Sequence, residues 1–421
     1  MVSRLPVLAL YGLFLLVCSL VTLSSKAAGL LWLLWVLAGL AMGWTSRRMA
    51  AVHDARVAGW VAGWVAGVWL TVTALALALR SVGMLYWGDT WDERHAELRL
   101  VLMALAVWLV LRRPLAAKRL LLARCLKLLT HGFAVACVLG LVQVARVGRE
   151  HLTTHPIAWA VGVALLSIWL LHSAVWQATS RMDRYFWLAG GVCGVLAVLA
   201  SQSRGAFGVV VWWLGLGVYV LWRNVRARPD WKRWVRQALL FVVVTAGVGG
   251  LVWQSGLWTR PAMALEQALH EYRATQQQAA GVVDTSFGAR LYMWQRAAEA
   301  VVQAPVWGYG QDGRRALVHQ WGRDANSDVV KSLGHAHNQY LNDALDHGVW
   351  GLASGLAYVL GLGWLAVYLW RRQYAFAGST LAGAAFMHAT ASLSNVNFAH
   401  NYYSTLLSIL VGLALVGSLR R

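Results

Sequence analysis

Side chains capable of acid–base chemistry gather in one short stretch of the sequence, residues 334–348. The stretch holds His335, His337, Asp343 and Asp346 and leads directly into an apolar segment. A neutral imidazole has an unperturbed pKa of about 6.5 and can take a proton from a hydroxyl near neutral pH. His337 is therefore the candidate general base. The alternative interpretation is that these histidines only cap the following helix.

The second histidine leaves two possibilities open. His335 would point away from His337 on a helix and could converge with it on a loop. A zinc site would require further converging ligands. Asp343, Asp346 and His347 are candidates for them, but the stretch contains no HExxH pattern. We therefore predict no metal at this position.

Two arginines elsewhere have the chemistry to bind phosphate oxygens. Arg204 lies in a short polar turn, 201–205, between apolar segments, and Arg290 opens a predicted helix with Trp294 four residues later. A guanidinium offers planar donors and a permanent positive charge. The alternatives are that Arg204 snorkels to lipid headgroups and that Arg290 is a solvated charge at a helix end.

A further polar turn, 394–403, separates the last two apolar segments and contains His400 and Asn401. If it lies on the same side as residues 334–348, these side chains line the same cavity. We include both residues among the candidate substrate-binding residues.

The elements that must position these residues are apolar. The chain of 421 residues is 59% hydrophobic and 13% charged, whereas a soluble domain carries about 25% charged residues. A membrane-spanning helix needs about 20 apolar residues. About twelve segments qualify as candidate spans, and they are 5–24, 27–44, 57–79, 97–112, 127–145, 157–177, 185–201, 206–222, 237–254, 348–370, 375–392 and 403–419.

Basic residues predict the orientation of these spans. Lys and Arg number 37 against 17 Asp and Glu. With both termini in the cytoplasm, the majority of the basic residues fall in short cytoplasmic loops and tails, as the positive-inside rule requires. Contact with anionic lipid headgroups then explains the charge, and we predict no nucleic-acid partner.

One long polar interval, 255–347, falls on the opposite side of the membrane. It contains an amphipathic helix over 260–280 and a second helix over 289–303, which Pro305 ends before the glycines of a tight turn, Gly308 and Gly310. The sequence therefore predicts an all-α polytopic membrane protein with spans in 1–254, a mainly helical periplasmic loop in 255–347, and further spans in 348–421.

Three short motifs resemble those of the O-antigen ligases, polytopic enzymes of Gram-negative inner membranes. The first is His337-Asn338, nine residues, then Gly348-Val349-Trp350-Gly351. The second is Ser203-Arg204-Gly205-Ala206, and the third runs from Arg290 through Trp294 to the segment 305–310. The number of spans and the position of the long loop are also similar to those of this family.

The resemblance implies a metal- and ATP-independent glycosyltransferase without a cofactor. Its donor would be O-antigen polysaccharide on undecaprenyl diphosphate, and its acceptor a sugar hydroxyl of lipid A-core. His337 would act as general base at the periplasmic face, with inversion at the anomeric carbon, while Arg204 and Arg290 bind the diphosphate. Asn338, Tyr340, Trp294 and His335 join His400 and Asn401 as expected substrate-binding residues.

Several alternatives remain open. O-antigen polymerases and protein O-oligosaccharyltransferases share these motifs, although we expect a longer periplasmic extension at the C-terminus of the latter. A lipid-linked glycan transporter would place ionisable residues in mid-span, where His172 and His388 are the main candidates. A purely structural membrane scaffold is disfavoured by the clustering of Arg and His.

Overall fold

The described part of the chain is helical throughout. The computed structural model describes residues 5–45, 56–91, 95–112, 119–152, 154–226 and 288–418, together with positions 239, 246, 247 and 250. No strand occurs within these ranges, which agrees with the predicted all-α class. The α-helices are α1 (Leu5–Ser19), α2 (Ser25–Thr45), α3 (Arg56–Trp87), α4 (His95–Leu111), α5 (Arg119–Val147), α6 (Pro156–Trp176), α7 (Arg181–Ala200), α8 (Gly208–Arg226), α11 (Gly288–Gln303), α12 (Gly310–Asp324), α13 (Asp328–Lys331), α14 (Gln339–Arg371), α15 (Ala375–Ser392) and α16 (Asn401–Gly417).

Helices occupy eleven of the twelve predicted spans. Within the described residues, six helical segments are long and apolar enough to cross a membrane, and they lie in α3, α5, α6, α7, α8 and α14. The segment of α8 begins at Arg204, in the turn before that helix. The predicted span 237–254 falls outside the described residues apart from four isolated positions, and the predicted helix 260–280 falls outside them entirely. The total of twelve spans and the three-part division of the chain stay predictions.

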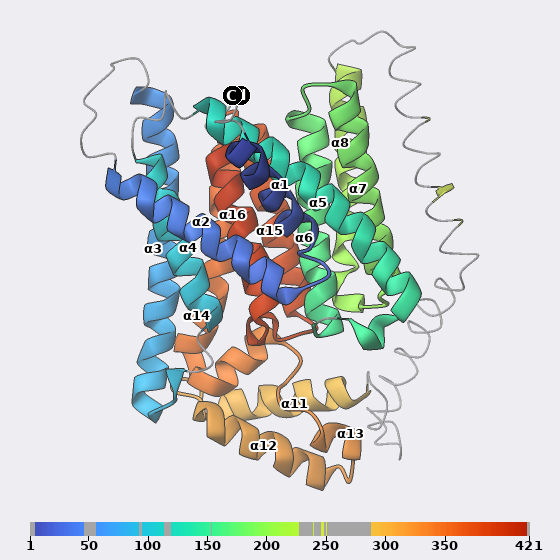
Figure 1. Cartoon of the computed structure of the whole chain (residues 1–421). Helices are drawn as coiled ribbons and strands as arrows, with labels where there is room; N and C mark the ends of the chain where they lie inside the picture. The colour runs from blue at the N-terminus through green and yellow to red at the C-terminus, as the bar shows by residue number, and fades with distance from the viewer. Residues whose placement is uncertain are drawn as a thin grey trace.

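A buried helix, α6, lies at the centre of the bundle. Its sequence is apolar on every side apart from Ser167, His172 and Ser173, which is typical of a helix covered all round. Trp159 and Trp169 are at most 1% exposed. Helices α7, α15 and α16 pack against α6, while α1 and α2 run obliquely across one face of the bundle (Figure 1).

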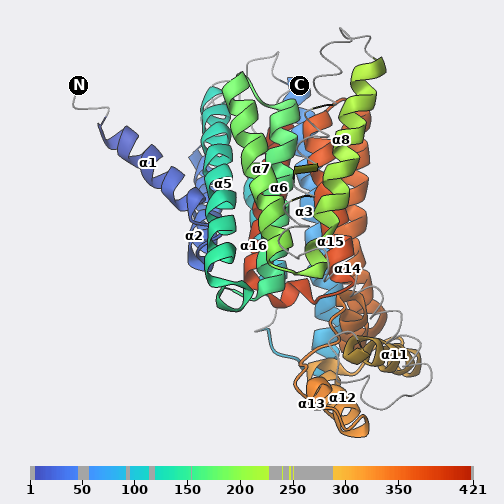
Figure 2. The same cartoon turned by 90° about the vertical axis from the view of Figure 1, so that its right-hand side faces the viewer.

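Three shorter helices, α11 to α13, form a separate layer beyond one end of the bundle, which we call the loop end (Figures 1 and 2). Helix α11 buries Ala289, Met293, Ala297 and Ala300, a spacing of three to four residues that places them on one face. Together with Val318, Trp321, Val330, Ala336 and Leu345, this face makes a second apolar core outside the bundle. The predicted helix 289–303 is thereby confirmed as α11.

Helix α14 connects this layer to the bundle through a kink. The helix leaves α-helical geometry at His347 and at Gly348, whose φ is +57° and ψ −138°. A Cβ atom at Gly348 would lie 2.3 Å from the Val306 carbonyl oxygen, so only glycine fits there. Backbone bonds from Val349 N to Pro305 O and from Tyr309 N to Leu345 O, both 2.8 Å, hold the segment 305–309 against the kink.

Candidate active site

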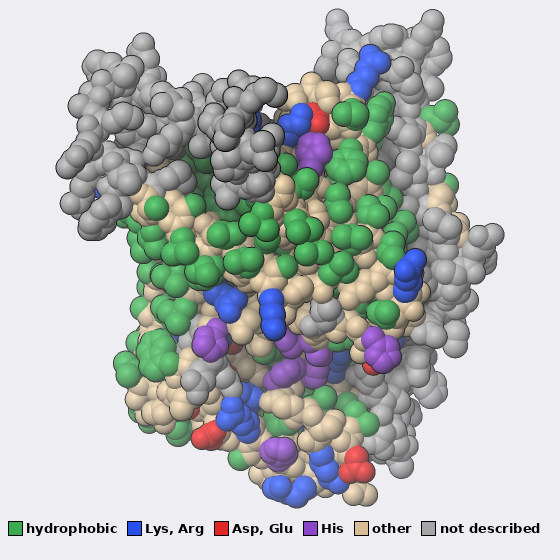
Figure 3. All heavy atoms as spheres, viewed as in Figure 1, with side chains coloured by type: hydrophobic (Ala, Val, Ile, Leu, Met, Phe, Trp, Pro, Cys, Tyr) green, Lys and Arg blue, Asp and Glu red, His purple; other side chains and the backbone are tan. Residues whose placement is uncertain are grey.

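Seven basic side chains from five separate segments meet at the loop end of the bundle. We call them the Arg–His cluster, and they are Arg149, His155, Arg204, Arg290, His335, His337 and His400. Figure 3 shows histidines gathered between the apolar band of the bundle and the loop helices, with Lys and Arg around them. The cluster lies where polar turns between helices face α11 and the start of α14.

The turns that supply these residues are far apart in the sequence. The 3₁₀ turn Arg149–His151 and the N-cap His155 lie between α5 and α6. Arg204 opens the 3₁₀ turn between α7 and α8, and His400 caps α16. The rings of His155 and His400 are stacked with centroids 4.6 Å apart, which joins two of the turns directly.

The stretch that carries His335 and His337 is a loop before α14, and this loop brings the two rings together. Their centroids are 4.3 Å apart. His337 has φ +49°, a left-handed conformation that is uncommon for residues other than glycine. Its backbone N–H donates to His335 Nδ1 at 3.3 Å, so the proton of a neutral His335 ring is on Nε2.

Two predicted substrate-binding residues shape this loop. The indole N–H of Trp294 donates to the Ala336 carbonyl at 2.9 Å, so α11 holds the residue between the two histidines. The Asn338 side chain caps α14 by accepting from Tyr340 N at 3.0 Å and Leu341 N at 3.2 Å. These contacts make Trp294 and Asn338 positioning residues in the ligand-free protein.

Burial and neighbouring positive charges keep the histidines of the cluster neutral. Burial, together with the neighbouring His335, Arg290, His155 and His400, lowers the pKa of His337 to about 3. Burial and neighbouring basic groups lower the pKa of His335 and of His400 to about 4. His337 Nδ1 is buried and accepts no hydrogen bond from any described residue. A neutral imidazole with an unused nitrogen can accept a proton.

The arginines of the cluster concentrate positive charge with little compensation. Burial lowers the pKa of Arg290, and the charges of Arg204 and Arg149 lower it further. In the described ranges no carboxylate lies within salt-bridge distance of Arg204 or Arg290, and Arg149 has only the exposed Glu150 at 3.6 Å. Like charges held together in this way are stabilised by an anion with several oxygens, such as a diphosphate.

Two other predicted residues lie beside the cluster. The Tyr340 hydroxyl donates to the Ala389 carbonyl of α15 at 3.3 Å. Asn401 is exposed and lines a polar cavity next to His335. The part of the chain that the structure describes contains no group of three or more His, Cys, Asp or Glu able to hold a metal ion.

Arg149 and His155 were missed in the sequence analysis. Both lie in the turn 148–155, which the predicted topology places on the same side as Arg204 and the long loop. The Arg and His residues of this turn, on the same side as Arg204, could have identified it as part of the site. Their convergence with Arg290 and His400 depends on tertiary packing, which residue spacing does not reveal.

The comparisons with known proteins agree with these motifs. A family model described as O-antigen ligase matches residues 189–354, which include Arg204, Arg290 and His337. The chain is 28% identical over 185 residues to an uncharacterized protein of Haemophilus influenzae, and the alignment covers 41% of this chain and 42% of that relative. The chain therefore spans less than half the length of this relative. The family match confirms the resemblance that the motifs predicted.

Proposed function

We propose that this chain, a member of the O-antigen ligase/polymerase superfamily, is a glycosyltransferase of the Gram-negative inner membrane. It would transfer O-antigen polysaccharide from undecaprenyl diphosphate to a sugar hydroxyl of lipid A-core. The observation that carries this proposal is the Arg–His cluster at one end of a bundle of apolar helices. Its arginines surround buried neutral histidines, and among the described residues Arg204 and Arg290 have no carboxylate partner. An anionic leaving group and a nucleophile that must lose a proton need these two kinds of side chain.

The transfer assigns a role to each part of the cluster. The acceptor oxygen attacks the anomeric carbon of the donor, and the bond from that carbon to the diphosphate oxygen breaks with its electron pair. Arg204 and Arg290 stabilise the negative charge that develops on the diphosphate, and Arg149 adds a third cation. His337 takes the proton of the acceptor hydroxyl. In this scheme undecaprenyl diphosphate leaves, and no metal, nucleotide or cofactor takes part.

The distribution of basic residues supports a periplasmic site. Four arginines lie on the side of the bundle opposite the loop end, and they are Arg112, Arg181, Arg223 and Arg371. Each lies at one end of a helix whose other end reaches the cluster turns or the loop helices. The positive-inside rule assigns such residues to the cytoplasm. The loop end then faces the periplasm, with both termini cytoplasmic, and both lipid-linked substrates can reach the cluster from the outer leaflet, which supplies proximity.

The transport alternative receives less support from the core histidines. His172 contacts Thr380 at 3.2 Å and accepts from Trp212 at 3.0 Å, and His388 contacts the Tyr403 hydroxyl at 2.7 Å. Each of these two histidines therefore has hydrogen-bonding partners within the packed helices. The Arg–His cluster lies instead at the loop end.

A reconstituted reaction tests the proposal and separates the remaining alternatives. The purified protein is incubated with undecaprenyl-diphosphate-linked glycan and lipid A-core, in EDTA and without nucleotide, and the products are resolved by electrophoresis and mass spectrometry. Glycan-capped lipid A-core is the expected product. Lengthened undecaprenyl-linked glycan would identify a polymerase instead. Absence of both products from a folded preparation that is active in cells would overturn the glycosyltransferase proposal.

A further inference from the structure

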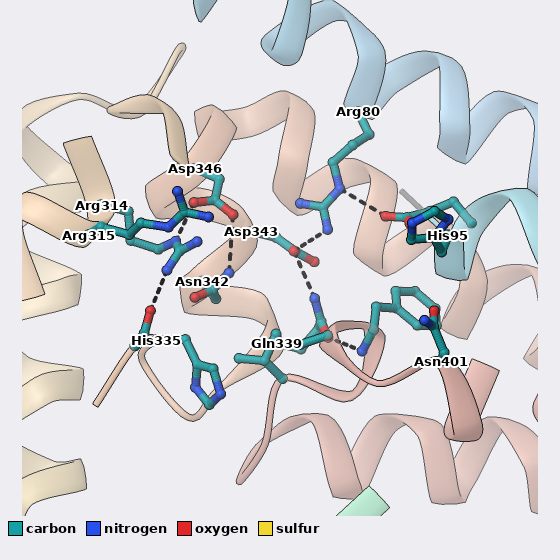
Figure 4. A pocket seen from close by; sticks show the side chains of 15 residues that line it. Arg80, His95, Arg314, Arg315, His335, Gln339, Asn342, Asp343, Asp346 and Asn401 are labelled. Carbon is teal, nitrogen blue, oxygen red and sulfur yellow. Dashed lines mark hydrogen bonds and ion pairs between the residues drawn. The ribbon is translucent and has the colours of Figure 1, made fainter. Parts of the chain in front are cut away.

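A polar cavity lies beside the Arg–His cluster, between the loop helices and the bundle. It has a volume of about 280 Å³, about nine times the share of one water molecule in the liquid. Side chains from α3, α4, α12, α14 and the segment 396–401 line it, as Figure 4 shows. Its rim includes the exposed residues Asn401 and Gly334, so the cavity extends from the buried interior to the surface.

Buried ion pairs form the inner wall of this cavity. Arg80 pairs with Glu97 at 3.3 Å and with Asp343, and Arg314 pairs with Asp346 at 2.5 Å. All five side chains are at most 5% exposed. Buried ion pairs add little net stability, because desolvation offsets the attraction between the charges. Buried charged groups that line a cavity more often mark a functional site.

Three polar atoms of this wall lack hydrogen-bond partners among the described residues. They are Arg80 Nη1, a donor, and the acceptors Asn342 Oδ1 and Asp343 Oδ2. All three residues are at most 5% exposed, and an unsatisfied buried polar atom costs on the order of 1–3 kcal/mol. The other end of the Asn342 amide is fixed, since Nδ2 donates to Asp346 Oδ2 at 3.1 Å. An unused donor and an unused acceptor in one cavity match a ligand with several hydroxyl groups, each of which donates and accepts.

The charge of the lining distinguishes the cavity from the Arg–His cluster. Three arginines, Arg80, Arg314 and Arg315, are balanced by the carboxylates of Glu97, Asp343 and Asp346. The cluster beside it has arginines without such compensation. The lining therefore favours a neutral polyhydroxyl group, and the cluster favours the diphosphate.

His335 belongs both to the lining of the cavity and to the Arg–His cluster. It lines the cavity, and it is close enough to Arg314 on one side and to His155 and Arg290 on the other for their charges to lower its pKa. An acceptor sugar in the cavity and a diphosphate at the arginines would therefore both lie beside His335.

We infer that this cavity is the binding site for the acceptor saccharide, and that Arg80 Nη1 and Asn342 Oδ1 hydrogen-bond the hydroxyls of the sugar ring seated in it. The inference rests on the proposed function, because the transfer reaction defines which substrate is the acceptor. The sugar ring is the part of a glycolipid acceptor whose chemistry matches a neutral lining rich in donors and acceptors.

Filling the cavity tests the inference with little risk to folding. Gly334 lines the cavity, has an ordinary φ, and has no heavy atom within 4 Å of the position of an added Cβ. Gly334→Phe should raise the KM for lipid A-core by roughly tenfold or more, with the KM for the undecaprenyl-linked donor unchanged. Gly363→Phe is the matched control, because Gly363 also has open space around its Cβ position and is not part of the cavity.

A second variant and a direct binding measurement make the test independent of one substitution. Asn342→Leu removes the unpaired acceptor at similar volume, together with the Nδ2 donor to Asp346. The folded variant should raise the acceptor KM by about threefold to tenfold, the worth of one hydrogen bond to the sugar. Core oligosaccharide released from lipid A is titrated into each detergent-solubilised protein by calorimetry. Gly334→Phe should abolish the binding that the natural protein and Gly363→Phe show.

The outcomes separate the two proposals. Oligosaccharide binding that Gly334→Phe abolishes, in a protein without transferase activity, would support the saccharide site and overturn the proposed function. Normal transfer by folded Gly334→Phe and Asn342→Leu proteins, with unchanged acceptor KM and binding, would overturn the saccharide site alone. A selective rise in the donor KM would also overturn it, because the cavity would then belong to the donor glycan. Failure of the natural protein in both assays would overturn both.

Discussion

At the scale of single residues, the histidine that is best placed to act as a base is held neutral by its surroundings. His337 is partly buried in a loop, and burial disfavours its protonation, as do the charge of Arg290 and any proton on the three neighbouring histidines. A bound diphosphate has the opposite effect, because negative charge nearby raises a histidine pKa. In the proposed reaction, a bound donor would therefore make His337 a stronger base.

This coupling predicts an unusual pH dependence. A general base is active only when unprotonated, so activity falls as the pH drops through its pKa. With a ligand-free pKa of about 3, kcat/KM should stay level from pH 8 down to about pH 5 instead of falling near 6.5. The acid limb of kcat, which reports the substrate complex, should lie at higher pH. An acid limb of kcat/KM with a midpoint near 6.5 would contradict a depressed His337 pKa.

Removing one cation of the cluster should slow the chemical step. Arg290→Ala should lower kcat by roughly 10²–10³-fold, the usual cost of losing one group that stabilises developing charge, while Arg290→Lys keeps part of the rate because the charge remains. Steady-state kinetics with saturating donor measures both. Arg296→Ala on the same helix is the control, because Arg296 pairs with Glu299 at the surface and lies outside the cluster. Equal rates for the Arg290→Ala and Arg296→Ala proteins would exclude Arg290 from transition-state stabilisation.

At the scale of elements, the kink in α14 explains the spacing between the histidine and the glycines of its motif. The first part of α14 runs from its Asn338 cap to the kink. There Gly348 allows the segment 305–309 to approach the helix backbone. Gly351 serves the same packing, since a Cβ atom there would lie 2.0 Å from the Asp343 carbonyl oxygen. The two glycines therefore set the position, relative to the bundle, of the first part of α14 and of the loop before it that carries His335 and His337.

A methyl group at the kink should disrupt this arrangement. Gly348→Ala combines a disfavoured positive φ with a clash against the Val306 carbonyl, and we expect a loss of stability on the order of 2–4 kcal/mol. Thermal unfolding in detergent should show a clearly lower Tm. Gly363→Ala in the same helix meets no neighbouring atom and should be neutral or stabilising by up to about 1 kcal/mol. Similar Tm values for the two variants would show that the kink does not require glycine.

The sequence predicted the helices better than the tertiary contacts between them. Hydrophobic runs gave the bundle helices, and Pro305 with the apolar face of α11 gave a loop helix that the structure confirms. The kink at Gly348 was not predicted, because its positive φ depends on contact with Val306 in another segment. The loop that brings His335 and His337 together was only one of two possibilities, since local sequence does not decide between loop and helix there.

At the scale of the whole molecule, the site is assembled from distant parts of the chain. Arg80 and Asp343 are separated by 263 residues, and His155 meets His400 across the bundle end. The motifs identified three members of the cluster, Arg204, Arg290 and His337, because each lies in a recognisable short pattern. Arg149, His155 and the ion pairs of the cavity lack such patterns, and only the packing of α3, α4, α5, α6 and α14 brings them to one end.

The most direct measurement compares transfer rates of two histidine variants in the reconstituted reaction. His337→Ala removes the proposed base, whereas His319→Ala removes an exposed histidine of α12 outside the cluster. We expect His337→Ala to lose at least about 10²-fold in kcat, with normal folding and donor binding, while His319→Ala keeps the natural rate. Equal transfer by both variants would contradict the central claim that His337 activates the acceptor hydroxyl.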